Sequence, residues 1–241
     1  MIATAGARRE PPLFVRVVPP VLRRSASMLR SAHAAVRAGT TLPRAGLLTL
    51  EGLGRVHLDV RGSAPGESRR LRSRALRDVL AELCRVHRIE IDVEGTLPDG
   101  PAVLVANHRS YLDPLVIAAL SACAPIAKQE VAGWPVVGAG ARALGVLFVR
   151  RDDPWSGARV LRDALRSLED GVPVLCFPEG TTTTAQHPLP FHRGVFGVAR
   201  LAGVPIVPIA LGYADPAACW VGDDDFLPPV SYTHLTLPTK A

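Results

Sequence analysis

The stretch Val103–Pro114 constrains the fold more than any other part of the chain. It opens with four consecutive apolar residues, Val103–Ala106, which are typical of a buried strand. It closes with Asp113 and Pro114, which predict a helix start with the aspartate as N-cap and the proline in the first turn. A strand joined to a helix by a short connection is the repeating unit of an α/β fold. His108 therefore lies just beyond the carboxyl end of a strand, where such folds present reactive groups.

The spacing of His108 and Asp113 favours a catalytic pair. Four residues separate the imidazole from the carboxylate, which is enough for the chain to turn back so that Asp113 bonds one ring nitrogen. Such a bond fixes the tautomer and leaves the other nitrogen free to accept a proton. The simpler alternative is a surface histidine beside a helix-capping aspartate.

The residues Asn107–Asp113 resemble the NHX4D motif of the glycerolipid acyltransferases, the family of 1-acyl-glycerol-3-phosphate acyltransferases. Three further blocks match the family in the same order: Gly145–Arg151, Phe177–Thr181 and Val204–Leu211. The resemblance covers roughly residues 88–228. It implies that His108 is the general base and that Asp113 orients it. It also implies acyl-CoA or acyl carrier protein as co-substrate, with no other cofactor.

The same blocks imply a site for the acceptor. The family's substrate-phosphate arginine falls on Arg151, and a guanidinium can hold a phosphate with two hydrogen bonds. In the third block, glycine lets backbone amides approach a ligand oxygen and Thr181 adds a hydroxyl. The expected substrate-binding residues are Lys128, Arg150, Arg151, Glu179, Gly180 and Thr181. The alternatives are a solvated lysine, an arginine pair bonded to Asp152 and Asp153, and a purely structural turn.

The expected reaction is transfer of a fatty acyl group to the sn-2 hydroxyl of 1-acyl-glycerol-3-phosphate, giving phosphatidic acid. Thr182 and Thr183 stand where relatives that act on lysophosphatidate commonly have Arg-Ser. One phosphate-binding arginine fewer makes another lyso-lipid, such as lyso-ornithine lipid, the alternative acceptor. A non-catalytic lipid-binding protein is the rival from another class. No metal site is expected, because His187 and His192 have no acidic or cysteine partner nearby.

Strand and helix patterns alternate along the chain and predict an α/β fold with a mainly parallel sheet, covered by helices on both faces and preceded by N-terminal amphipathic helices. The expected strands are Ile89–Val93 at an edge, Val103–Ala106, a short one near Ile126, Val172–Phe177 and Pro205–Leu211. The expected helices are Leu71–Val86, one ending near Ala122, Pro154–Leu168 and Arg193–Ala202. A candidate short strand lies at Val56–Val60, and residues 1–20, with four prolines, are expected to be irregular.

Charge divides the chain into two parts. Residues 1–88 hold 17 arginines and 6 acidic residues, whereas residues 89–241 hold 11 basic and 16 acidic ones. Within the first part, Val21–Ala38 combines apolar residues at helical spacing with arginines every seven residues, which favours a helix in a membrane interface. A helix packed on its own domain is the alternative there, and an arginine-rich solvated face is the alternative for the basic part as a whole.

The expected organisation has three segments. Residues 1–69 form a basic extension, and residues 70–229 form the acyltransferase domain, expected to stop short of its natural C-terminus. Residues 230–241 resemble a translated sequencing-adapter end and are expected to be foreign to the protein.

The expected location is the cytoplasmic face of the cell membrane, held peripherally by an anionic lipid surface. The longest uncharged runs, Pro114–Ala127 and Leu201–Ala214, have 14 residues each, whereas a spanning helix needs about 20. Aromatic residues for base stacking are scarce, so nucleic acid is not an expected partner. The four cysteines lie far apart and are expected to be buried free thiols in a reducing compartment: Cys84, Cys123, Cys176 and Cys219.

Overall fold

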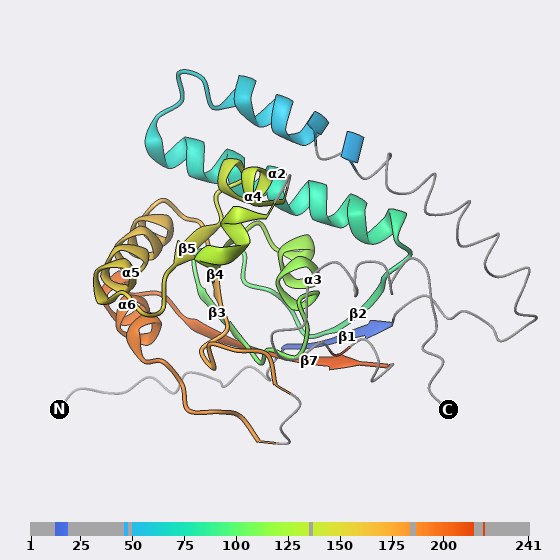
Figure 1. Ribbon diagram of the computed structural model, residues 1–241, viewed down its shortest axis with the longest axis vertical. Coiled ribbons are helices and arrows are strands. Elements are labelled where there is room, and N and C mark those ends of the chain that lie inside the picture. Colours follow the sequence, from blue (N-terminus) through green and yellow to red (C-terminus); the bar gives the residue numbers. More distant parts are fainter. Residues whose placement is uncertain are drawn as a thin grey trace, which may run out of the picture.

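The computed structural model describes residues 13–18, 46–47, 50–134, 137–183, 187–214 and 219. The interfacial helix expected over Val21–Ala38 and the expected foreign tail over residues 230–241 lie outside these described residues. The strands are β1 (Leu13–Val18), β2 (Glu90–Glu94), β3 (Val103–Ala106), β4 (Ala124–Lys128), β5 (Leu147–Val149), β6 (Val174–Cys176) and β7 (Ile206–Tyr213) (Figure 1). The helices are α2 (Pro65–Val86), α3 (Asp113–Leu120), the 3-10 helix η1 (Gln129–Gly133), α4 (Val137–Ala143), α5 (Pro154–Glu169) and α6 (Gly194–Ala202).

The strands form one seven-stranded sheet in the order β2-β1-β7-β3-β6-β4-β5. Neighbouring strands are parallel throughout, except for the antiparallel pair of β1 and β2. The expected α/β class and mainly parallel sheet are therefore confirmed, as is the edge position of β2. Because parallel strands end at the same side of a sheet, the connections that follow β3, β4, β5 and β6 share one edge with the last residue of β7. We call this side the carboxyl edge.

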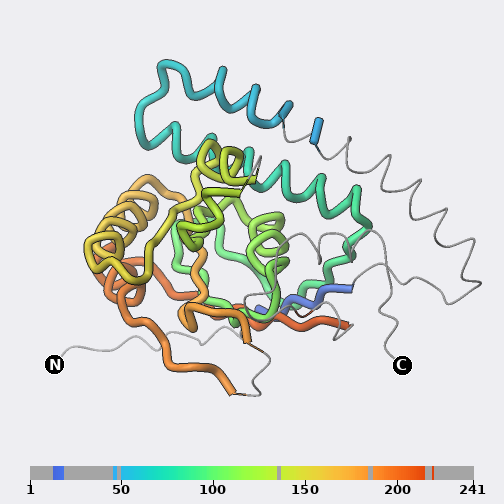
Figure 2. Tube along the Cα trace, viewed as in Figure 1, coloured from blue at the N-terminus to red at the C-terminus, as the bar shows by residue number. Residues whose placement is uncertain are grey.

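Helices cover the two faces of the sheet, and β3 shows how the sequence directs this. Successive side chains of a strand point to opposite faces. Leu104 and Ala106 join the core beneath α2 and α3, whereas Val103 and Val105 join the core beneath α5 and α6. All four residues are buried. Because both faces of β3 are covered, its sequence is an unbroken apolar run. Figure 2 shows α5 and α6 lying side by side.

The strand β1 lies inside the sheet, so the expectation of irregular structure is wrong for residues 13–18. It pairs parallel with β7 and antiparallel with β2. Leu13, Val15 and Val17 are buried in the core beneath α2 and α3, whereas Phe14 and Arg16 are exposed. This alternation is the signature of a strand with one buried face. The flanking prolines bound the strand and do not prevent it, and a strand from the basic N-terminal part is thus built into the main sheet.

The candidate strand at Val56–Val60 is also wrong, because residues 50–59 are helical. Leu53, Val56 and Val60 recur at helical spacing and pack against the core. Val56 is the buried member of the three, while Leu50 and Leu58 remain exposed on the other side of the segment. The apolar and polar residues of 56–60 alternate as they would in a strand. The segment is helical because its apolar residues at helical spacing pack against the core from one face of the helix.

Candidate active site

The carboxyl edge gathers the segments that carry the expected site residues. His108 follows β3, the block Phe177–Thr181 follows β6, Lys128 ends β4, and the pair Arg150–Arg151 follows β5. Their common edge follows from the parallel pairing of β3, β6, β4 and β5. The sheet therefore places on one side of the molecule residues that are up to 73 positions apart in the sequence.

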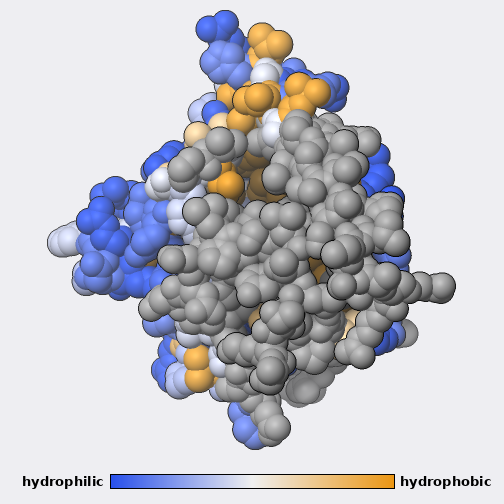
Figure 3. Space-filling model, turned by 45° about the vertical axis from the view of Figure 1, so that its right-hand side comes forward, coloured by the Kyte–Doolittle hydropathy of each residue, from blue (hydrophilic) through white to orange (hydrophobic). Residues whose placement is uncertain are grey.

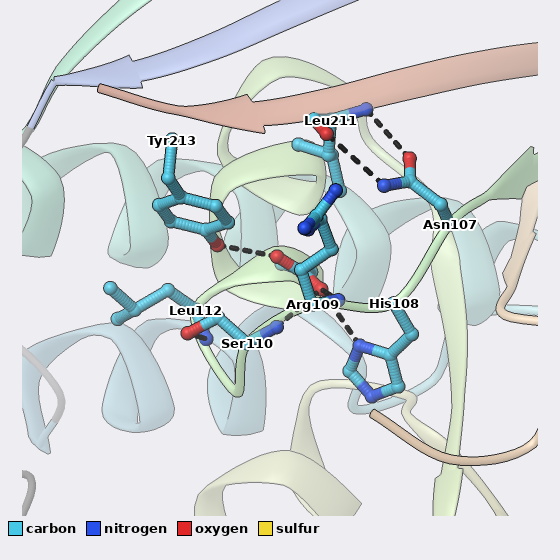
Figure 4. A network of polar contacts seen from close by, with 8 residues as sticks. Asn107, His108, Arg109, Ser110, Leu112, Leu211 and Tyr213 are labelled. Atoms are coloured by element: carbon cyan, nitrogen blue, oxygen red, sulfur yellow. Dashed lines mark hydrogen bonds and ion pairs between the residues drawn. The ribbon is translucent and has the colours of Figure 1, made fainter. Parts of the chain in front are cut away.

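The centre of the site is the carboxylate of Asp113, which is fully buried. Its Oδ2 accepts hydrogen bonds from the backbone N–H groups of Arg109, at 2.6 Å, and Ser110, at 2.8 Å. The same oxygen lies 2.8 Å from Nδ1 of His108. Its Oδ1 accepts a hydrogen bond from the hydroxyl of Tyr213 (Figure 4). Hydrogen-bond donors on both oxygens offset the cost of keeping a carboxylate away from water.

The start of α3 differs from the prediction in one respect. Leu112 is the N-cap residue, and Asp113 is the first residue of the helix, with Pro114 directly after it. The side chain of Asp113 therefore does not cap the helix. It turns back into the preceding loop, because the backbone donors of that loop and the imidazole lie there.

The ring of His108 is held from several directions. Nδ1 is engaged by the buried carboxylate of Asp113, so Nε2 is the nitrogen left to take a proton from a substrate. The ring stacks on Phe177, with centroids 4.3 Å apart and planes inclined by 24°. The N–H of Thr183 donates to the carbonyl oxygen of His108 at 2.9 Å. With 15% of its side chain exposed, the imidazole is accessible but fixed.

The strand β7 supports the motif through hydrogen bonds that the sequence analysis missed. Asn107 donates through Nδ2 to the carbonyl oxygen of Leu211 at 3.1 Å and accepts through Oδ1 from the N–H of Leu211 at 2.7 Å. Two residues further on, Tyr213 reaches Asp113. Burial, together with the charge of Asp113, raises the pKa of the Tyr213 hydroxyl, so it stays protonated and able to donate.

The turn after β6 shows why glycine stands at position 180. Gly180 has a φ of +74°, and its N–H donates to the carbonyl oxygen of Phe177 at 3.0 Å. A Cβ at this position would lie only 2.9 Å from Nε2 of His192. Glu179 is nearly buried and accepts a hydrogen bond from the N–H of Leu189 at 3.1 Å. Glu179 thus fixes the loop that follows, while Thr181 is exposed beside the turn.

The arginine pair after β5 is exposed. Neither Arg150 nor Arg151 forms an ion pair with any residue that the structure describes. The alternative in which Asp152 and Asp153 neutralise the pair is therefore not what the structure shows. Asp153 instead caps α5, where it accepts a hydrogen bond from the N–H of Trp155. The positive charge at this end of the carboxyl edge is available to an anionic ligand.

Arg151 also lies close enough to the loop that carries His108 to interact with it electrostatically. Partial burial lowers its pKa from the ordinary value, while the nearby groups of Glu130 and Tyr111 act in the opposite direction. Tyr111 belongs to the loop between His108 and Asp113. Two strands lie between β3 and β5 in the sheet, which sets their ends about 14 Å apart at the usual strand spacing. Lys128 lies between them, at the end of β4.

The remaining reactive groups do not form a second centre. The described residues contain no cluster of three or more His, Cys, Asp or Glu side chains that could hold a metal ion. Burial raises the pKa of Cys84 to about 11 and those of Cys123 and Cys176 to about 12. These three are buried free thiols, as expected, and stay protonated at neutral pH. Cys219 is only partly buried.

The fold and site define an α/β protein with a histidine–aspartate pair at the carboxyl edge of its sheet. Residues 88–212 match the sequence profile of the family described as Acyltransferase. The chain belongs to this family, and the expected family membership is confirmed.

Individual relatives carry two kinds of name. The chain is 37% identical over 163 residues to the lyso-ornithine lipid O-acyltransferase of Pseudomonas aeruginosa, which covers 65% of this chain and 62% of the relative. It is 33% identical over 165 residues to the 1-acyl-sn-glycerol-3-phosphate acyltransferase of Neisseria meningitidis serogroup B, covering 68% and 61%. A crystal structure of the 1-acyl-sn-glycerophosphate (LPA) acyltransferase of Thermotoga maritima gives a TM-score of 0.46 at 22% identity, over 80% of this chain and 93% of the other. The chain thus spans about three fifths of the length of the curated relatives it matches.

Proposed function

We propose that the protein is a lyso-lipid O-acyltransferase in which His108 is the general base. The observation that carries the proposal is the pairing of His108 with a fully buried Asp113 at the carboxyl edge. A carboxylate held by hydrogen bonds on both oxygens orients the imidazole and stabilises its protonated form. Membership of the acyltransferase family and the names of the relatives support the same reaction class.

The reaction needs no covalent enzyme intermediate. Nε2 of His108 removes the proton of the acceptor hydroxyl, and the hydroxyl oxygen attacks the carbonyl carbon of the acyl thioester. The tetrahedral intermediate collapses with loss of the thiolate of CoA or of acyl carrier protein, which takes the proton back from the imidazolium. A positioned base supplies about 10²- to 10⁴-fold, so binding geometry supplies much of the remaining acceleration. The three cysteines with raised pKa are unsuited to an acyl-enzyme route.

The acceptor inferred from the sequence is 1-acyl-glycerol-3-phosphate, and the exposed arginine pair supports it. Arg150 and Arg151 lie on the same edge as His108 and have no described ion-pair partner. A phosphate held there and by Lys128 leaves the glycerol backbone to run along the edge toward His108. The turn at Gly180 and Thr181 lies after β6, between these two points in the sheet order.

Lyso-ornithine lipid is the second candidate, and a specific observation favours it. Thr182 and Thr183 stand where relatives that act on lysophosphatidate commonly have Arg-Ser, so the turn supplies one cation fewer. The ornithine headgroup carries a carboxylate and an ammonium group, which demands less positive charge from the protein than a phosphate does. Relatives from Pseudomonas aeruginosa, at 37% identity, and Rhizobium meliloti, at 31%, bear this name.

Peripheral attachment to a membrane is part of the proposal. Leu47, Leu50 and Leu58 are each more than 60% exposed, and the exposed Arg55 and Arg61 lie in or directly after the same helical segment. Figure 3 shows hydrophobic side chains next to strongly hydrophilic ones at the upper end of the molecule, where residues 50–59 and α2 lie. Apolar and basic side chains on one surface suit an anionic lipid interface. The described residues include no helix long and apolar enough to span a bilayer.

The decisive experiment is an acyl-transfer assay with a panel of acceptors. Purified protein in detergent or lipid vesicles receives radiolabelled acyl-CoA or acyl carrier protein, with 1-acyl-glycerol-3-phosphate, lyso-ornithine lipid or a zwitterionic lysophospholipid. We expect labelled product with one of the first two acceptors. His108→Ala should lower kcat at least 100-fold while leaving vesicle binding unchanged.

The matched control is His57→Ala, an exposed histidine in the helical segment of residues 50–59 that belongs to none of the four sequence blocks. It should transfer acyl groups at the wild-type rate. Product formation by His108→Ala at the wild-type rate would remove the proposed mechanism. A preference for lyso-ornithine lipid over the phosphate acceptor would select the second candidate.

A further inference from the structure

Tyr213 touches the candidate catalytic pair from a part of the chain that the sequence motifs do not reach. It is the last residue of β7, exactly 100 positions beyond Asp113. Its hydroxyl donates to Oδ1 of Asp113, and Ser110 hydrogen-bonds the same hydroxyl. In Figure 4 the ring of Tyr213 points from β7 straight at the carboxylate, on the opposite side from His108.

The two oxygens of Asp113 have different supports. Oδ2 already receives two backbone N–H groups and faces Nδ1 of His108. Oδ1 faces β7, and among the described residues its hydrogen-bond donor is Tyr213. Because the carboxylate is fully buried, no water is at hand to replace that donor. Without the Tyr213 hydroxyl, Oδ1 would have no hydrogen-bond donor among the described residues. The carboxylate would then lose one of the contacts that fix its orientation.

The position of Tyr213 is itself fixed by the sheet. The side chain of Asn107 forms two hydrogen bonds with the backbone of Leu211, a pair that we call the clasp. The clasp joins the end of β3 to β7 two residues before Tyr213. The next strand, β1, pairs Val17 with Tyr213 on the other side. The backbone is thus held on both sides, and from this position the ring brings its hydroxyl to the buried carboxylate.

We propose that Tyr213 is a positioning residue for acyl transfer, holding the side chain of Asp113 in the rotation that presents Oδ2 to His108. This rests on the proposed function of the His108–Asp113 pair. The working unit is then a chain of three side chains, Tyr213, Asp113 and His108, in which the tyrosine acts through the aspartate and does not touch the substrate.

The test is Tyr213→Phe, which removes the hydroxyl and keeps the ring. We expect kcat to fall about 10- to 30-fold with little change in KM for donor or acceptor, as for loss of a hydrogen bond that supports a charged group. Without the donor, the buried carboxylate takes up a proton more readily. The acid limb of the kcat/KM profile therefore moves to higher pH, and the loss of activity is greatest below neutrality.

Ser73→Ala is the matched control. Ser73 is also buried, and its hydroxyl donates to the carbonyl oxygen of Arg70 in α2, away from the carboxyl edge. It should leave kcat and the pH profile unchanged. A Tyr213→Phe profile that coincides with that of the wild type in both height and position would overturn the proposal.

Two further measurements test the role of Tyr213 separately from the proposed acyltransferase function. NMR titration of the His108 ring reports the apparent pKa of the His108–Asp113 pair without any turnover, and in Tyr213→Phe it should move upward. If the wild type transfers no acyl group, the proposed function fails, yet the titration still shows whether Tyr213 affects the His108–Asp113 pair.

In an Asp113→Asn background, Tyr213→Phe should cause no further loss of rate. A further loss equal to that of the single change would mean that Tyr213 acts independently of Asp113.

Discussion

The two ends of the carboxyl edge are built in opposite ways. At the β3–β7 end, a carboxylate that is fully buried receives donors on both oxygens, and its partners come from two segments of the chain, the loop after β3 and the end of β7. At the β5 end, Arg150 and Arg151 are exposed and form no ion pair within the described part of the chain. The first end has its charge compensated before any ligand arrives, whereas the second keeps its charge for a ligand.

Under the proposed function, this difference leads us to expect separate tasks at the two ends. Preorganised groups act on the reacting atoms, because they need no rearrangement during the reaction. Exposed cations attract and hold a headgroup, and their contribution appears in substrate affinity. Substitutions at the buried end should therefore reduce kcat and often stability, while substitutions at the exposed end should change KM and leave the fold intact.

The largest effect is expected from Asp113→Asn. The amide keeps the shape of the side chain but loses the charge that stabilises the imidazolium, so kcat should fall about 10³- to 10⁴-fold. Initial rates and thermal unfolding of the purified variant measure the two consequences. A variant that retains more than a tenth of the wild-type kcat would show that the buried end is structural and not catalytic.

A smaller effect is expected from Asn107→Ala, which cuts the clasp between β3 and β7. Both backbone groups of Leu211 lose their partner, which should lower the free energy of unfolding by about 1–3 kcal/mol. We expect kcat to fall about 10-fold, because the motif loop loses its attachment to the strand that carries Tyr213. Denaturant unfolding measures the free energy of unfolding, and steady-state kinetics measure kcat. A loss of stability with unchanged kcat would mean that the clasp stabilises the fold and has no role in activity.

At the exposed end, Arg151→Ala should raise KM for the phosphate acceptor about 10-fold and change kcat by less than threefold. Its melting temperature should stay within about 1 °C, since an exposed charge contributes little to stability. Arg166→Ala is the matched control, an exposed arginine in the last turn of α5 at the opposite side of the sheet. Equal KM values for the two variants would contradict the headgroup role of Arg151.

The smallest effect is expected from thiol alkylation. Cys84, Cys123 and Cys176 are buried with pKa values raised to about 11 to 12, so the reactive thiolate is scarce below pH 10. Native protein treated with N-ethylmaleimide at pH 7 and again at pH 9 should show no modification of these three residues by mass spectrometry. Rapid labelling of Cys176 at either pH would mean that the β6 end of the core opens in solution.

Much of the fold could be predicted from local pattern, because each parallel strand is bounded by recognisable turns and each covering helix has an apolar stripe. The edge strand β2, the long helix α2 and the alternation after residue 103 follow the expected order. The errors arose where a local pattern is ambiguous. Residues 56–60 alternate like a strand, but they belong to a helical segment that buries one face. The prolines around residues 13–18 indicate irregular structure, whereas the alternation of these residues themselves indicates the strand that forms.

The candidate site divides in a similar way. His108 and Asp113 are close in the chain, so their contact was predicted from spacing alone and the structure confirms it. The hydrogen bond of Tyr213 joins residues 100 positions apart, and that of Asn107 joins residues 104 positions apart. Local sequence carries no sign of such contacts, because they arise only when β7 takes its place beside β3. The roles expected for Lys128, Glu179 and Thr181 in acceptor binding remain predictions.

The placement of β1 has a consequence for how this protein is made and handled. The strand is synthesised well before its neighbour β7, which begins nearly two hundred residues later, so the part of the sheet around β1 cannot close until β7 has been made. Chain closure over such a distance is slow and leaves strand edges open in the meantime. A shortened version that discards the basic extension, residues 1–69, would also discard this strand, leaving β7 and β2 without the neighbour that joins them.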